Sequence, residues 1–172
     1  AVRVGTSDAG AVLSAAEAFL GRPGGTWSAA HVAGPVEIGA RFSGTLDHPD
    51  VRAVLDAPAL SVGALHDLRL TGTTTVRRDA VTVPELRAEW GDAVVAASGR
   101  AALDGARSVQ GRVTAEALTI DALRAALDLT HVPVSGTLTA SASVGGTLDA
   151  ADVRGTLRGD SLVAYAEPLG TL

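Results

Sequence analysis

Histidine, serine and glycine are the residues of this sequence whose type and spacing could carry catalysis or hold a metal or a phosphate. The four histidines lack the spacing of a zinc motif such as H-E-x-x-H. They are His31, His48, His66 and His131. No serine lies in a G-x-S-x-G turn, the glycines form no phosphate-binding loop, and there is no cysteine. We therefore expect no enzyme activity, no cofactor and no metal site.

The most regular acidic residues belong to a segment that occurs twice, 102 residues apart. Residues 44–60, GTLDHPDVRAVLDAPAL, match residues 146–162, GTLDAADVRGTLRGDSL, and nine of the seventeen positions are identical. Aspartate favours turns because its side chain can bond the nearby backbone, and proline favours them because it fixes φ. We expect the aspartates of the two copies to form turns and not to act as catalysts. They are Asp47, Asp50, Asp149 and Asp152.

The elements that position these residues are mainly strands. Alternating runs at 36–42 and 138–144 lead into the two copies, and runs beginning at Val51 and Val153 return from them. The alternation places apolar side chains on one face and polar side chains on the other. Between the copies, further strands are expected over 68–76, 80–90, 93–103 and 108–117. The pattern indicates about ten strands of roughly 8 to 10 residues.

Two short amphipathic helices are expected, one before each copy. Residues 11–20 and 120–129 carry apolar side chains at helical spacing, and Thr119 is a suitable N-cap for the second. Two such helices cannot cover about ten strands, which together are roughly 48 Å wide. The sheet must therefore curl on itself or cover a ligand with its apolar face.

Most of the apolar residues are small, and side-chain size decides whether a closed sheet can fill its interior. The sequence is 47% hydrophobic, but only five residues are aromatic. Alanine, valine and glycine do not reach across a gap that phenylalanine or tryptophan would fill. The expected fold is mainly β, a long curled antiparallel sheet with an apolar concave face and two short helices. A closed β-sandwich with a dry interior stays open as an alternative.

Charge and hydropathy limit the partners. The net charge is −5 and the arginines are scattered along the chain. A surface that binds nucleic acid needs a continuous basic stripe, so we expect no nucleic-acid partner. No run approaches the roughly 20 apolar residues of a membrane span, so any anchor is expected outside this chain. We expect one repetitive domain over 1–172, with a first unit at about 8–117 and an incomplete second unit at about 118–172. The chain is expected to be a section of a longer protein.

The succession of helix, alternating strand, G-T-L-D block and polar return strand, ending in Glu167-Pro-Leu-Gly170, resembles a known family. It is similar to the translocation and assembly module proteins of the TamB type and to their AsmA-like relatives, which are repeating β-groove, bridge-like lipid transfer proteins. The second copy departs from the pattern at Ala150-Ala151, where proline is usual. The resemblance implies a taco-shaped sheet, an inner-membrane anchor elsewhere, a periplasmic location and an outer-membrane partner of the TamA type.

The function expected from this resemblance is the movement of phospholipids between the inner and outer membranes, with acyl chains held by the apolar face. The alternative is a scaffold for outer-membrane protein assembly or secretion that offers an open sheet edge to another strand. The residues expected to line the groove are apolar and alternate along the strands of the two copies. They are Val36, Ile38, Phe42, Leu46, Val51, Leu55, Leu138, Val144, Leu148, Val153 and Leu157.

Overall fold

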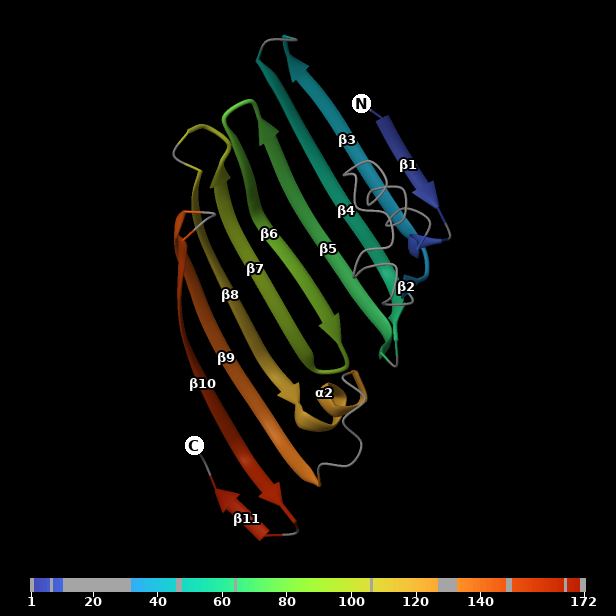
Figure 1. Ribbon diagram of the computed structural model, residues 1–172. Coiled ribbons are helices and arrows are strands. Elements are labelled where there is room, and N and C mark those ends of the chain that lie inside the picture. The colour runs from blue at the N-terminus through green and yellow to red at the C-terminus, as the bar shows by residue number, and fades with distance from the viewer. Residues whose placement is uncertain are drawn as a thin grey trace.

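The computed structural model describes residues 2–6, 8–10, 32–45, 48–63, 65–105, 107–126, 133–147, 150–165 and 167–170. Over these residues the chain is mainly β, and eleven strands form a single antiparallel sheet (Figure 1). The first strands are β1 (Val2–Thr6), β2 (Val32–Ala33), β3 (Val36–Gly44), β4 (Pro49–Val62), β5 (Leu65–Arg77) and β6 (Ala80–Trp90). The remaining elements are β7 (Ala93–Ala102), β8 (Ser108–Thr119), α2 (Ile120–Ala126), β9 (Val134–Thr147), β10 (Ala150–Ala164) and β11 (Glu167–Gly170).

The strands lie side by side in chain order. From β3 to β11 each strand pairs with the next one along the chain, while β1 pairs with β3 and β2 adds to β4. Because β1 and β11 end the order at opposite sides and do not pair, the sheet is open (Figure 1). Sequential pairing of this kind needs only short turns, which agrees with the turn signals between the alternating runs.

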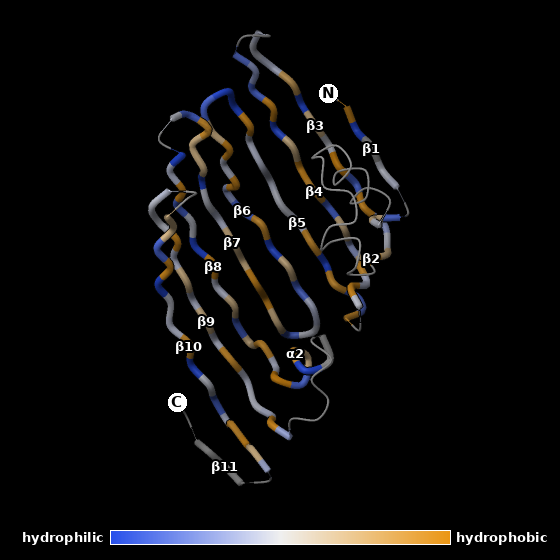
Figure 2. Tube along the Cα trace, viewed as in Figure 1, coloured by the Kyte–Doolittle hydropathy of each residue, from blue (hydrophilic) through white to orange (hydrophobic). Residues whose placement is uncertain are grey.

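Two faces follow from the strand register, and hydropathy alternates along the strands accordingly (Figure 2). The apolar face carries one continuous cross-strand row from β3 to β10, which consists of Ile38, Leu55, Gly72, Leu86, Ala97, Val113, Ala142 and Gly155. The polar face carries a neighbouring row of Arg41, Arg52, Thr75, Thr82, Arg100, Gln110, Gly145 and Asp152. A separation of this kind requires that the register be kept across eight strands, since a slip of one residue would exchange the faces.

The turns of the two repeated copies are built alike. Gly44 and Gly146 both have positive φ, and a side chain at either would overlap the carbonyl oxygen of the residue four positions on. The Thr45 and Thr147 hydroxyls each accept a hydrogen bond from the backbone N–H three residues on, over 3.2 Å in both copies. The G-T pair of the repeated block therefore forms the hairpin turn.

The expectation that the aspartates form these turns is wrong for the two that are described. Asp50 and Asp152 are strand residues on the polar face, and their carboxylates bind Arg77 and Arg154, each over 3.0 Å. Their side chains point out of the pleat toward cross-strand or same-strand neighbours, so they do not reach the turn backbone. Asp47 and Asp149 lie outside the described residues.

The strands β4, β9 and β10 are longer than expected, at 14, 14 and 15 residues. The return strands β4 and β10 continue past the end of their alternating runs because each contains a β-bulge, in β4 between Ala57 and Leu60 and in β10 between Asp160 and Val163. A bulge takes up one extra residue and lets the strand resume pairing. Pro58 is tolerated at this position for that reason.

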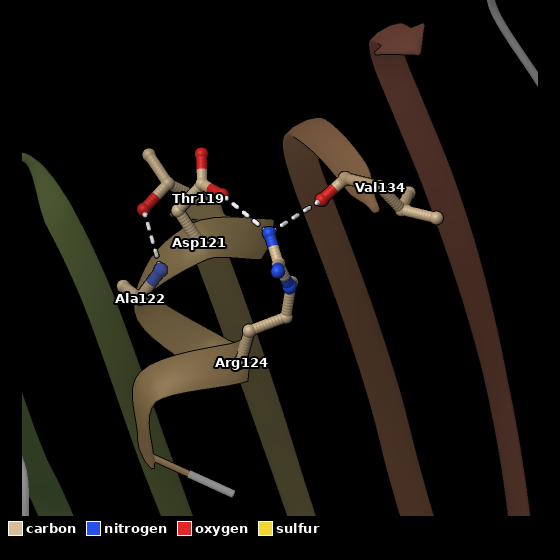
Figure 3. Close-up of polar contacts among 5 residues, drawn as sticks. All are labelled: Thr119, Asp121, Ala122, Arg124 and Val134. Atoms are coloured by element: carbon tan, nitrogen blue, oxygen red, sulfur yellow. Dashed lines mark hydrogen bonds and ion pairs between the residues drawn. The ribbon is translucent and has the colours of Figure 1, made fainter. Parts of the chain in front are cut away.

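The helices are confirmed only in part. The second helix is α2, and the Ala122 N–H donates to the Thr119 hydroxyl over 3.4 Å, as the expected cap requires (Figure 3). Arg124 binds Asp121 over 3.1 Å and donates to the Val134 carbonyl over 3.4 Å, which joins the helix to the start of β9. The first expected helix, at 11–20, lies outside the described residues.

The core is small and lies at one end of the sheet. Ala9, Val36, Ala57 and Leu60 are buried together where residues 8–10 and β2 meet β3 and β4. Partly buried residues of β2 to β5 pack around them, namely Val32, Ile38, Leu55, Leu68 and Leu70. No large side chain among the described residues is completely buried. Most of the sheet therefore has no second layer packed against it in the part that the structure describes.

Candidate functional site: an exposed apolar face

The residues expected to line a groove fall in two groups on the same face of the sheet. The register pairs Ile38 with Leu55 and Phe42 with Val51 in β3 and β4, and Val36 lies on the same side by alternation. In β9 and β10 it pairs Val144 with Val153, while Leu138 and Leu157 lie opposite Gly159 and Ala140. The continuous row through Leu55 and Gly155 connects the two groups. Leu46 and Leu148 lie outside the described residues.

Sequence reasoning missed the middle of this face, because it named residues only in the two repeated copies and in the alternating runs that lead into them. The strands β5 to β8 separate the two groups, and their apolar side chains fill the space between them. The signal was available in the same alternation that predicted these strands. The residues missed are Leu70, Val76, Val81, Val83, Leu86, Ala88, Val95, Ala97, Val109, Val113 and Ala115.

The exposure of this face changes from one end to the other. Ala57 is completely buried in the small core, whereas Phe42 at the far end of the same hairpin is 63% exposed and Leu157 is 68% exposed. Among the described residues, seven of the ten exposed large hydrophobic side chains lie on this face. They are Val2, Phe42, Val76, Leu86, Val113, Val153 and Leu157.

A shallow hollow of about 290 Å³ marks this face over β8, β9 and β10. Its apolar lining comes from Val113, Ala115, Ala140, Ala142 and Leu157. In this hollow Ala140 of β9 lies between Ala115 and Leu157, and Ala142 lies between Val113 and Gly155, so each alanine has one larger neighbour. An elongated apolar ligand could lie in such a depression without displacing a side chain.

Among the described residues of β3 to β10 that are paired in the sheet, the charged side chains lie on the opposite face. Within the strand-paired rows of β3 to β10, the apolar face carries no charged side chain among the described residues. Ion pairs of the polar face include Arg3–Glu37 at 2.8 Å and Arg87–Glu89 at 2.6 Å. These pairs are partly or largely exposed and contribute little to stability. These charged side chains keep the polar face hydrated, while the opposite face remains apolar.

The histidines form no reactive cluster in the described part of the chain. His48 is exposed in the turn before β4, and a ring nitrogen of the exposed His66 lies 3.2 Å from the Ser61 hydroxyl near the turn between β4 and β5. His31 and His131 lie outside the described residues. No group of three or more His, Asp or Glu side chains that could hold a metal occurs among the residues described.

Comparisons of this chain with family models, with curated proteins and with solved structures find no match. In the described part, no helix is both long and apolar enough to cross a membrane. The exposed apolar face and the sheet edges are therefore the features from which a function can be argued.

Proposed function

We propose that this chain is a segment of a lipid-transfer groove, in which the apolar face holds the acyl chains of phospholipids. The observation that carries the proposal is a charge-free apolar face that continues across eight strands, is partly exposed over most of its length and is exposed at residues such as Leu157. A protein in water gains free energy by covering such a face, at about 25 cal/mol per Å² of apolar area. An acyl chain is long, flexible and apolar, and it needs no directional contact.

The proposal includes curling of the sheet, so that the apolar face becomes the concave side of a trough. Two observations support this. The helix α2 follows β8 and precedes β9, yet it also contacts β5, so it reaches across the end of the β6–β7 hairpin. Bulges interrupt β4, β8 and β10, and bulges increase local twist and bend the sheet. A closed sandwich would need a second layer over residues such as Leu157, and among the described residues none covers it.

In this proposal the lipid moves by sliding. Each methylene that leaves water gains up to about 0.8 kcal/mol, and the gain is nearly the same at every position along an even apolar surface. The side chains of β7 and β9 on this face are small, such as Ala97 and Ala142, so they present little steric hindrance to a sliding acyl chain. The head group stays in water beyond the groove. By resemblance, we propose a periplasmic location, an anchor in the inner membrane, and a TamA-type partner at the outer membrane.

The test places a charge on the face at an exposed position. Leu157→Arg should reduce photo-crosslinking of a phospholipid to a photoreactive residue at Val113 by about tenfold, because both positions line the same hollow and a guanidinium among acyl chains is costly. The matched control is Thr139→Arg, at an exposed position on the polar face of β9 that does not line this hollow. Mass spectrometry of the crosslinked protein measures how much lipid is attached at Val113. Equal amounts of attached lipid in the two variants would refute the groove.

A second candidate function has its own observation. The outer edge of β10 is unpaired over most of its length in the described structure, so the chain could act as a scaffold that binds another strand during outer-membrane protein assembly or secretion. The same two variants separate the candidates. If the chain is such a scaffold, Leu157→Arg should leave binding of the partner strand unchanged, because main-chain hydrogen bonds would hold that strand.

A further inference from the structure

Two arginines of the polar face lie directly opposite each other on neighbouring strands. The register of β3 and β4 pairs Arg41 with Arg52, and both side chains are exposed. Like charges at directly opposite positions of two antiparallel strands repel each other and destabilise the pairing. In the part of the chain that the structure describes, neither arginine takes part in an ion pair. The two positive charges are therefore uncompensated within the sheet.

The carboxylates closest to this pair along β3 and β4 are bound to other arginines. Asp50, two residues before Arg52 on the same face of β4, binds Arg77 of β5 over 3.0 Å. Glu37 of β3 binds Arg3 of β1 over 2.8 Å. Neither carboxylate is therefore available to neutralise the pair.

A hollow of about 430 Å³ lies beside the pair on the polar face. Gly39 keeps it open, because a side chain added there would meet no other described atom within 4 Å. Arg3 and the two opposite arginines line the hollow, and Val54, which is opposite Gly39 and 48% exposed, adds an apolar surface. The hollow thus combines room, positive charge and a small apolar wall.

The internal repeat provides a comparison, because a second hollow lies at the equivalent positions of β9 and β10. Five lining positions coincide at the offset of 102 residues, and in the second copy they are Ser141, Ala142, Ser143, Arg154 and Thr156. There Ser143 replaces Arg41, and Asp152 binds Arg154 over 3.0 Å. Of the two described hollows, the first alone has two opposite arginines with no acidic partner.

We propose that the hollow over Gly39 binds the phosphate group of a phosphomonoester, whose oxygens are held by Arg41 and Arg52. Two guanidinium groups match the charge of a phosphomonoester, which is about −1.5 to −2 at neutral pH, whereas a carboxylate would leave one of them unbalanced. Each guanidinium presents N–H donors in a planar fork that suits phosphate oxygens. Val54 contacts the organic group. The inference does not rest on lipid binding, since the hollow lies on the face opposite the groove.

The first test titrates the protein with inorganic phosphate and with phenyl phosphate at constant ionic strength. NMR shifts of the arginine Nε–Hε signals measure the affinity. Arg41→Gln and Arg52→Gln should each weaken binding about fivefold, because each removes one charge-assisted contact. Arg154→Gln, at the position equivalent to Arg52, is the matched control and should leave the affinity unchanged. Circular dichroism checks the fold, which these exposed substitutions should leave intact.

The second test fills the hollow and keeps both arginines. Gly39→Leu should weaken binding of phenyl phosphate at least several-fold, because the leucine side chain would occupy the space of the ligand. Gly145→Leu is the matched control, since open space also surrounds that position, which does not line the hollow. Equal affinities of the two variants would show that phosphate binds elsewhere and would contradict the proposal.

The third test separates a lipid source of the phosphomonoester from a soluble one. Phosphatidylcholine vesicles with and without phosphatidic acid, a lipid phosphomonoester, are sedimented with the protein. Sedimentation that requires phosphatidic acid and is lost in Arg41→Gln would support the site with a lipid as its source. Binding of phenyl phosphate without sedimentation would support it with a soluble source.

Three results would overturn the proposal. They are the absence of any arginine shift with phosphate or phenyl phosphate, an equal loss of affinity in Arg52→Gln and Arg154→Gln, or benzoate binding as tight as that of phenyl phosphate. The second would mean that general charge attracts the anion, and the third that the site does not select phosphate. None of these results concerns lipid crosslinking at Val113, so failure here is distinct from failure of the groove.

Discussion

Gly44 and Gly146 explain why the repeated block is most similar at its beginning. Both turns need a residue with positive φ next to a carbonyl oxygen, and the following threonine accepts a backbone N–H. Only glycine takes this conformation without a steric cost. The identical Gly-Thr pair of the block thus encodes the shape of a hairpin turn.

This reading predicts a difference between two neighbouring glycines. Gly146→Ala should lower the free energy of unfolding by about 1 to 3 kcal/mol, because the new side chain would be strained at positive φ and would meet the Ala150 carbonyl. Gly145→Ala is the control, since open space surrounds that position. Urea unfolding followed by circular dichroism measures both. Equal stability of the two variants would contradict the assigned role of Gly146.

Gly34 and Gly136 extend the repeat beyond the block that the sequence comparison found. They are also 102 residues apart, both have positive φ, and both lie against the bulged part of the return strand. A side chain at Gly136 would come within 2.8 Å of a Leu162 methyl group. Extending the alignment upstream would have revealed the pair, but only the structure shows that the bulge requires it.

At the scale of elements, the return strand β10 has a buried end and an exposed end. Leu162, which lies in the bulge between Asp160 and Val163, is 8% exposed, and its equivalent Leu60 in the first copy is 4% exposed. Leu157 lies five residues earlier and is largely exposed. The bulge changes which residues of β10 point into packed surroundings, and simple alternation of the sequence could not predict it.

The two leucines should therefore respond differently to truncation. Leu162→Ala should destabilise the protein by about 2 to 4 kcal/mol, because it leaves a cavity in packed surroundings. Leu157→Ala should cost less than about 1 kcal/mol, because most of that side chain already contacts water. Thermal unfolding of both variants would measure the difference. A larger loss for Leu157→Ala would mean that the apolar face is packed and not open.

The helix α2 illustrates which contacts of an element are local. The Thr119 cap is within reach of sequence reasoning, since it joins residues three positions apart. The bond from Arg124 to the Val134 carbonyl joins residues ten positions apart across a connection, and it depends on where β9 begins (Figure 3). The approach of α2 to β5 is a further contact that only the folded sheet creates.

At the scale of the whole molecule, the strand order predicts a gradient of local stability. Strands with two neighbours along their length, such as β6 and β7, should protect their amides from hydrogen exchange more strongly than the end strands β1 and β11. In β10 only those amides that point toward β9 should be protected over residues 152–158. Exchange measured by NMR would test this pattern. Uniform protection along β10 would mean that its outer edge is covered.

The sequence by itself determined the alternation, and with it the strands, the turns and the two faces, because period-two hydropathy and turn residues are local properties. It also determined that residues 44–60 and 146–162 repeat the same pattern of turn and strand residues. Only the tertiary structure decided that the strands pair in chain order in an open sheet, that β5 to β8 join the two groups of apolar residues into one face, and that Asp50 binds Arg77. These features depend on register and on contacts between distant residues, and short-range patterns do not specify them.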